Sequence, residues 1–302
     1  MNAPPALAVE LSAVIVAVTD GEPQVAVTSG LALPTGPFGT GHRTLEQGLR
    51  AWVAAQGGLR LGYVEQLYTF ADEDRTMRDG RRVVSVSYLA LARDLAASAD
   101  PPTGWYRHFP WEDRRHGVAP VTLPIMQALT RWKNAAPDAA TRRARDERIA
   151  ITFPKDPKRW NEELVLQRYE LLWSAGLIEE SRRGAASPIP PIPTGVALAH
   201  DHRRILATGI ARLRAKIKYR PVVFELMPDR FTLLQLQSTV EALAGLRLHK
   251  QNFRRLVQGQ GLVEEARGHS ADTRGRPAQL FAFRREVLRE RAAAGTKLPR
   301  SG

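Results

Sequence analysis

A short segment near the C-terminus combines residue types that can read the edges of DNA bases. Gln251, Asn252, Arg254 and Arg255 lie close together, and Lys250 stands at their edge. Arginine suits paired hydrogen bonds to guanine and glutamine suits adenine, while flanking cations hold phosphates. We therefore expect this segment to enter the major groove of double-stranded DNA. A solvated basic helix face, or a surface for protein contacts, would use the same residue types.

Two predicted helices position these side chains. Thr232 and Gln235 form the capping-box signature of a first helix, which Gly245 ends. After a short turn, the spacing of apolar residues predicts a second, basic helix over 249–258. Its apolar face is expected to contain Phe253, Leu256 and Val257.

Two short strands, predicted over 262–265 and 279–283, complete this domain. The polar segment 266–277 lies between them and would form a basic wing. Helix, turn, basic helix and basic hairpin in this order predict a winged helix-turn-helix domain. Four further cations are expected to contact the DNA backbone: Arg274 and Arg276 in the wing, and Lys216 and Lys218 at the end of the preceding helix.

The charge distribution supports a polyanionic partner for this end of the chain. Residues 203–302 contain 21 Lys and Arg against 8 Asp and Glu, a net +13. Residues 1–202 contain 23 of each and are neutral, so the whole net charge of +13 lies in the last third. A field this concentrated favours DNA or RNA as the partner.

Composition narrows the class of protein. The 302 residues include no cysteine, which excludes disulfides and thiolate metal sites and fits a reducing compartment. The apolar run 11–18 is too short to span a membrane, and no Lys or Arg precedes it as in a signal peptide. We expect a soluble cytoplasmic protein without a membrane partner.

The N-terminal part alternates strands with one helix. An amphipathic helix begins near Leu45 and ends at Gly57 and Gly58. Strands are predicted over 12–18, 23–28, 63–70 and 83–92.

Helical periodicity dominates residues 100–186. Helices are predicted over 124–132, 141–149 and 159–180, and another helix runs from about 200 to 219 after a proline-rich segment. His200 and His202 are better suited to packing or capping than to a shared metal, because positions i and i+2 lie on different helix faces. The tryptophans of this region are expected in the core: Trp105, Trp111, Trp132, Trp160 and Trp173.

The stretch 33–57 resembles a Nudix box, the loop-helix motif of nucleoside diphosphate-linked hydrolases. It keeps the Leu-Pro-x-Gly entry and five box positions: Gly36, Gly41, Glu46, Arg50 and Gly57. It departs where an active box has metal-binding glutamates, at His42, Ala51, Ala54 and Ala55. Alanine supplies no oxygen ligand for Mg²⁺, so the usual hydrolysis is expected to be absent.

Further stretches are similar to Nudix-related transcriptional regulators of NAD metabolism, in the same order along about 200 residues. They are 63–70, 81–88, 198–205, 213–219, 231–233, 252–255 and 275–278. The resemblance implies an α+β protein: a Nudix-like α/β/α sandwich with a helical insertion, followed by a winged helix-turn-helix domain. The predicted boundaries are a sensor domain over 8–218 (insertion about 100–186, proline-rich loop 187–194), a DNA-binding domain over 219–290 and a flexible tail over 291–302.

The resemblance also implies a function. A repressor of NAD biosynthesis genes would bind operator DNA as a homodimer and sense an NAD-related nucleotide, such as ADP-ribose, in a catalytically inactive Nudix domain. Neither a cofactor nor a metal is expected. Four arginines near the implied cleft are candidates for binding pyrophosphate: Arg43, Arg50, Arg81 and Arg82. Ordinary surface pairing, and for Arg50 a salt bridge within the box helix, are the alternatives.

Two other functions fit the same residues. The first is a nucleotide pyrophosphohydrolase with an atypical metal site, joined to a nucleic-acid-binding domain. The second is a non-catalytic RNA-binding or scaffold protein.

Overall fold

A mixed six-stranded sheet organises the N-terminal part of the protein in a computed structural model, which describes residues 7–39, 41–71, 81–183, 192–270 and 277–287. Its strands are β1 (Ala8–Thr19), β2 (Glu22–Val25), β3 (Thr35–Pro37), β4 (Val64–Phe70), β5 (Val83–Leu91) and β6 (Thr103–Gly104). The order is β4-β5-β1-β2-β6, with β3 also pairing with β1. β1 and β5 are parallel, and the other pairs are antiparallel.

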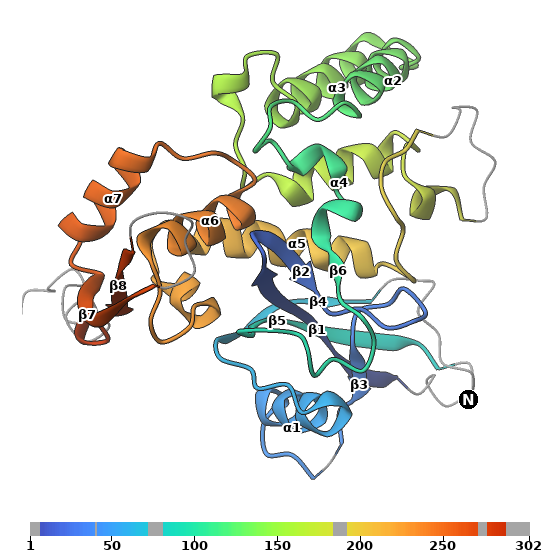
Figure 1. The fold of residues 1–302 in the computed structure, drawn as a ribbon. Coiled ribbons are helices and arrows are strands. Elements are labelled where there is room, and N and C mark those ends of the chain that lie inside the picture. The colour runs from blue at the N-terminus through green and yellow to red at the C-terminus, as the bar shows by residue number, and fades with distance from the viewer. Residues whose placement is uncertain (1–6, 40, 72–80, 184–191, 271–276, 288–302) are drawn as a thin grey trace, which may run out of the picture.

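Helices cover both faces of this sheet, which forms an α/β/α sandwich (Figure 1). Leu11 and Ile15 of β1 pack toward α1 (Leu45–Gly57), while Val14 and Val16 pack toward α5 (His202–Ile217). Alternate residues of a strand face opposite sides of the sheet, so the continuous apolar run of β1 serves both layers. The α/β/α sandwich predicted from the sequence is confirmed.

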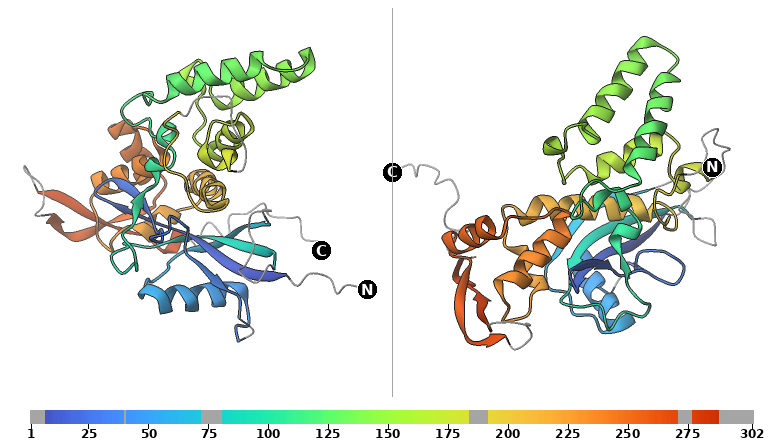
Figure 2. Two further views of the ribbon diagram at one scale, coloured as in Figure 1. Left: turned by 90° about the vertical axis from the view of Figure 1, so that its right-hand side faces the viewer. Right: turned by 45° about the horizontal axis from the view of Figure 1, so that its top comes forward.

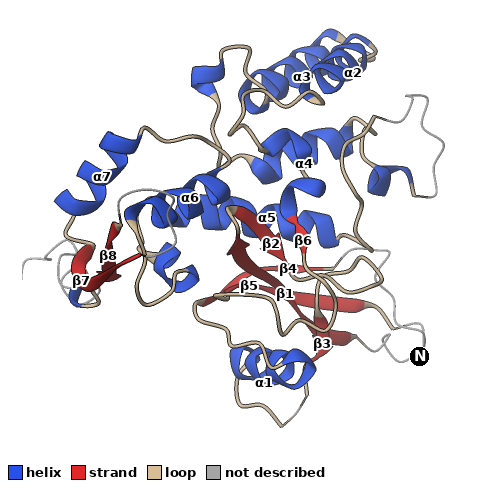
Figure 3. Cartoon of the chain, viewed as in Figure 1, coloured by secondary structure: helices blue, strands red, loops and turns tan. Residues whose placement is uncertain are grey.

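The insertion forms a helical layer beyond α5 (Figures 1 and 3). It contains α2 (Thr122–Asn134), α3 (Ala139–Thr152), α4 (Val165–Ser174) and the short 3₁₀ turns η1 (Trp105–Arg107), η2 (Pro110–Glu112), η3 (Pro157–Arg159) and η4 (Glu179–Arg182). The single helix predicted over 159–180 is wrong. Asn161 instead accepts a hydrogen bond from the Glu163 amide in a local turn, and Gly176 takes a left-handed conformation just beyond α4. The five tryptophans pack in or against the core as expected.

The C-terminal domain follows α5 almost without a linker. It contains η5 (Val222–Leu226), α6 (Leu233–Ala244), α7 (Lys250–Gly259), β7 (Val263–Ser270) and β8 (Ala278–Phe283). The capping box of Thr232 and Gln235 is present, and β7 pairs antiparallel with β8. Figure 2 shows α7 and the β7-β8 hairpin at one end of the molecule, away from the N-terminal strands. This arrangement is the winged helix-turn-helix that the sequence predicted.

Some expectations concern residues outside the described ranges. The predicted tail over 291–302 and most of the proline-rich loop belong to this group, as do Arg274 and Arg276 of the wing. Within the described part of the chain, no helix is long and apolar enough to cross a lipid bilayer.

Candidate nucleic-acid interface and sensor site

Helix α7 presents the polar side chains that the sequence indicated. Phe253 and Val257, one turn apart, are its buried residues. The five candidate groove residues are all exposed: Lys250, Gln251, Asn252, Arg254 and Arg255. A helix with a buried stripe this narrow leaves most of its circumference free for a partner.

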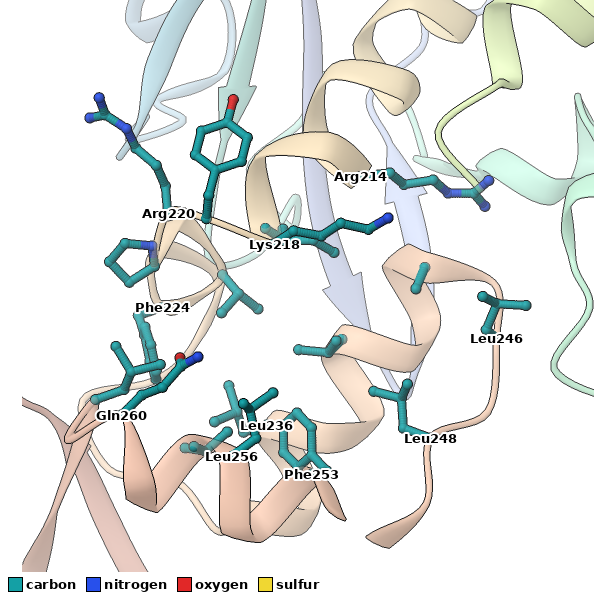
Figure 4. A pocket seen from close by; sticks show the side chains of 18 of the residues that line it. Arg214, Lys218, Arg220, Phe224, Leu236, Leu246, Leu248, Phe253, Leu256 and Gln260 are labelled. Carbon is teal, nitrogen blue, oxygen red and sulfur yellow. The ribbon is translucent and has the colours of Figure 1, made fainter. Parts of the chain in front are cut away.

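Leu256 differs from the sequence interpretation, which placed it on the buried face. Its side chain is 57% exposed and lies at the edge of an apolar cavity behind α7. Figure 4 shows Leu236, Leu248 and Phe253 around this cavity, whose volume is about 320 Å³. α7 is therefore held by few apolar contacts and has open space on its inner side.

A buried carboxylate fixes the turn between α6 and α7. Glu241 accepts hydrogen bonds from Gln237, from the Leu248 amide and from Arg247. Burial alone would raise the pKa of this carboxyl, but these donors hold the pKa below its ordinary value. The start of the second helix is thus set by a charged group at the end of the first.

Lys216 and Lys218 both form ion pairs within the protein. The Lys216 ammonium lies 2.7 Å from both Glu65 and the Tyr63 hydroxyl, and its side chain is 9% exposed. Lys218 pairs with Glu162 at 2.8 Å and Glu163 at 2.6 Å. The burial of Lys216 against Glu65 speaks against its expected phosphate contact, whereas the contact expected of the half-exposed Lys218 stays a prediction.

The end of α6 is held by three hydrogen bonds that sequence reasoning missed, two from the insertion and one from α5. The Tyr106 hydroxyl donates to the Ala242 carbonyl at 2.6 Å, and Arg214 Nε donates to the Leu243 carbonyl at 2.9 Å. The Arg114 amide donates to the Gly245 carbonyl at 2.9 Å. Carbonyls at a helix C-terminus lack partners within the helix, and a cation there also offsets the helix dipole.

A buried ion cluster supports this attachment. The Glu112 carboxylate lies 2.5 Å from Arg168 Nε and 2.6 Å from Arg214 Nη1, and all three side chains are at most 1% exposed. Burial alone would raise the pKa of Glu112, but the two guanidinium groups outweigh it and hold the pKa below its ordinary value. The partners are 56 and 102 positions away from Glu112, so no local spacing could reveal them.

The box helix lacks the carboxylates of a hydrolase and uses its arginine structurally. Arg50 pairs with Glu46 at 2.9 Å and donates to the carbonyls of Leu61 and Gly62. Ala51, Ala54 and Ala55 are exposed, and His42 is half-buried. Among the described residues, no group of three or more His, Cys, Asp or Glu side chains is placed to hold a metal ion.

The four candidate ligand arginines are not brought together. The Arg50 guanidinium binds beside Gly62, whose amide contacts Leu91 at the end of β5. Exposed Arg81 and Arg82 precede the start of that strand, roughly 30 Å away at about 3.3 Å per residue. Arg43 is exposed at the entrance to α1. One pyrophosphate therefore cannot contact Arg50 together with Arg81 or Arg82, and each of these arginines stays a separate candidate.

The histidines have a structural role in this region. His202 is buried, and its Nδ1 accepts a hydrogen bond from the Leu33 amide at 2.9 Å. This bond joins the start of α5 to the first residue of the box-like stretch, which agrees with the packing role expected of His202.

Comparison with known proteins finds relatives of the C-terminal domain. Residues 223–283 match the family model described as the NrtR DNA-binding winged helix domain. The ADPR responsive transcriptional repressor NtrR of Acinetobacter baylyi is 42% identical over 86 residues, which are 28% of this chain and 34% of that relative. The chain thus matches about a third of the length of this curated relative.

Two solved structures share the overall fold. Shewanella oneidensis NrtR in complex with a 27mer DNA is 20% identical, with a TM-score of 0.55 over 93% of this chain and 95% of that chain. The same protein without DNA gives a TM-score of 0.52, with 20% identity over 91% and 94% of the two chains. Residues 223–283 therefore form an NrtR-type DNA-binding winged helix domain, and the chain has, over most of its length, the fold of Shewanella oneidensis NrtR.

Proposed function

We propose that this protein is a transcriptional repressor of NAD biosynthesis genes that binds operator DNA through α7 and the wing. The observation that carries the proposal is the exposed row of Gln251, Asn252, Arg254 and Arg255 on the second helix of an NrtR-type winged helix domain. Such a helix places its side chains against base edges in the major groove. A cytoplasmic homodimer, whose two-fold axis matches paired half-sites, completes the proposal.

The effector of this repressor is an NAD-related nucleotide bound by the N-terminal domain. The relative from Acinetobacter baylyi is described as ADPR responsive, which supports ADP-ribose as the first candidate. A nucleotide regulates DNA binding only if it has different affinities for DNA-competent and incompetent arrangements of the protein. The continuous helix α5 and the open space behind α7 offer a physical route for such a change.

The proposal predicts that substitution of the two arginines on α7 weakens operator recognition. Changing Arg254 and Arg255 to Ala should cost about 1–3 kcal/mol for each base that an arginine no longer reads. Gel shifts on the chain's own upstream region and on NAD-synthesis promoters, with and without nucleotide, measure this effect. The ratio of operator to random-sequence affinity must fall; an unchanged ratio would reject α7 as the reading helix.

A second prediction separates the sensor from an enzyme. With Mg²⁺ and either ADP-ribose or a dinucleotide, the protein should show no turnover, because Ala51, Ala54 and Ala55 supply no metal ligand. A working Nudix hydrolase assayed in parallel provides the positive control. Turnover that disappears in Glu46→Gln would instead support the pyrophosphohydrolase with an atypical metal site.

A further inference from the structure

The insertion carries exposed positive charge that the structure does not compensate. Between residues 131 and 159 the sequence has nine Lys and Arg against four Asp and Glu. Six of these cations are exposed and form neither an ion pair nor a side-chain hydrogen bond in the described part of the chain: Arg131, Arg142, Arg143, Lys155, Lys158 and Arg159. An exposed group of unpaired cations has the chemistry to bind a polyanion.

These cations fall into two groups by their place in the fold. α2 leads outward and α3 returns, so Arg131, Arg142 and Arg143 lie near the tip of this helical hairpin. Lys155, Lys158 and Arg159 follow α3, at the base of the hairpin and about 14 Å or more along the helix axis from the tip. Figures 1 and 2 show this base on the side of the insertion toward α7.

Direct contacts connect the base of the hairpin to the turn that precedes α7. Trp160 follows η3, and the Arg114 guanidinium lies 4.1 Å from the centre of the Trp160 ring. The amide of the same Arg114 donates to the Gly245 carbonyl at the end of α6. Arg114 and Trp160 therefore form a chain of contacts between η3 and the helix-turn-helix turn.

The segment that carries these cations is held in place. Arg168, fixed by Glu112, donates to the carbonyls of Asn161 at 3.0 Å and Thr152 at 3.3 Å, on either side of η3. Asp156 caps η3 by accepting from the Lys158 amide at 2.9 Å. A charge on a preorganised turn loses less conformational freedom on binding than one on a loose chain.

From this placement we propose that Lys155, Lys158 and Arg159 form a second DNA-contact surface, which binds backbone phosphates beside the half-site read by α7. The inference rests on the proposed function, since it extends the same protein–DNA interface. Elements next to a recognition helix meet the phosphates that border the groove, and the turn before α7 is such an element. The insertion thus lengthens the DNA footprint without reading sequence.

The test compares two double variants that remove the same charge. Lys158→Ala with Arg159→Ala removes two cations at the base, and Arg142→Ala with Arg143→Ala removes two at the tip. Binding is measured at several salt concentrations on an operator with long flanks and on an operator trimmed to its half-sites. Unchanged thermal unfolding confirms that these surface changes leave the fold intact.

The base variant should bind the long operator at least on the order of tenfold more weakly. The magnitude of its salt slope should decrease by about 0.9 for each phosphate that is no longer neutralised, which is about 1.8 for each protomer and about 3.6 for the proposed homodimer. On the trimmed operator, and for the tip variant on both, binding should match the unsubstituted protein. Equal weakening in the base and tip variants would overturn the inference, because it would show that net positive charge rather than a specific contact attracts the DNA. An effect of the base variant on RNA binding alone would overturn it as well. Failure of the unsubstituted protein to bind any duplex would instead reject the proposed function.

Discussion

Replacing Glu112 by glutamine should lower the free energy of unfolding by about 3–5 kcal/mol, as expected when one partner of a buried ion cluster is removed. Glutamine keeps the shape of the side chain but leaves Arg168 and Arg214 without a compensating charge, and both guanidinium groups are 0% exposed. Denaturant unfolding at neutral pH measures the change. Glu46→Gln is the matched control, because its pair with Arg50 is exposed and contributes less than about 1 kcal/mol.

The contribution of the Glu112 charge to the free energy of unfolding should depend on pH in a defined direction. The folded-state pKa of Glu112 lies below the unfolded one, so its charge stabilises the fold above the ordinary glutamate pKa of about 4.3. Below that pH the unfolded state binds the proton first, and the contribution is lost as pH falls. The difference between the unsubstituted protein and Glu112→Gln should therefore narrow in acid. A difference that stays constant from pH 7 to pH 3 would mean that the cluster is not the cause.

Gly245→Ala should destabilise the protein by several kcal/mol and weaken operator binding as well. Gly245 has φ of 71°, a left-handed conformation that costs about 1–2 kcal/mol for other residues. An added Cβ would also overlap the Glu112 carbonyl and lie 2.9 Å from both Arg214 Nη2 and the Tyr106 hydroxyl. The end of α6 would have to move off the insertion, and α7 would move with it.

The variant Gly58→Ala separates the cost of a left-handed backbone from the cost of steric overlap. Gly58 ends α1 with φ of 66°, yet a Cβ there meets nothing within 4 Å. This control should show the backbone cost alone and leave operator affinity unchanged. An equal decrease of stability in the two variants would show that the packing of α6 against the insertion contributes little. Denaturant unfolding and gel shifts on the same preparations measure both properties.

Local patterns in the sequence predicted the elements well. Three predictions depend on neighbours within a few residues: the capping box at Thr232 and Gln235, the helix ends at Gly58 and Gly245, and the apolar strand around Val14. The prediction of one helix over 159–180 was wrong because it used the apolar periodicity alone. The local turn at Asn161 outweighs that periodicity and interrupts the helix. Order and spacing of such signals sufficed for the fold class.

Contacts over long sequence distances could not be predicted. Nothing near Glu112 in the sequence indicates Arg214, and the partner of Lys216 on β4 becomes visible only when α5 is placed on the sheet. The candidate groove residues of α7 were found because the faces of one helix follow from spacing alone. The placement of Arg50 and Arg82 at opposite ends of β5 could not be predicted either, because no motif encodes it.

The position of α5 has a consequence for biosynthesis. This helix covers the sheet face that contains Val14 and Leu89, yet it begins about 110 residues after β5 ends. At roughly 5–20 residues per second, a ribosome takes on the order of ten seconds to make the intervening insertion. Throughout that interval the nascent sheet has one apolar face without its helix. The inserted helices therefore lengthen the period in which the emerging chain can be captured by a chaperone or by another nascent copy.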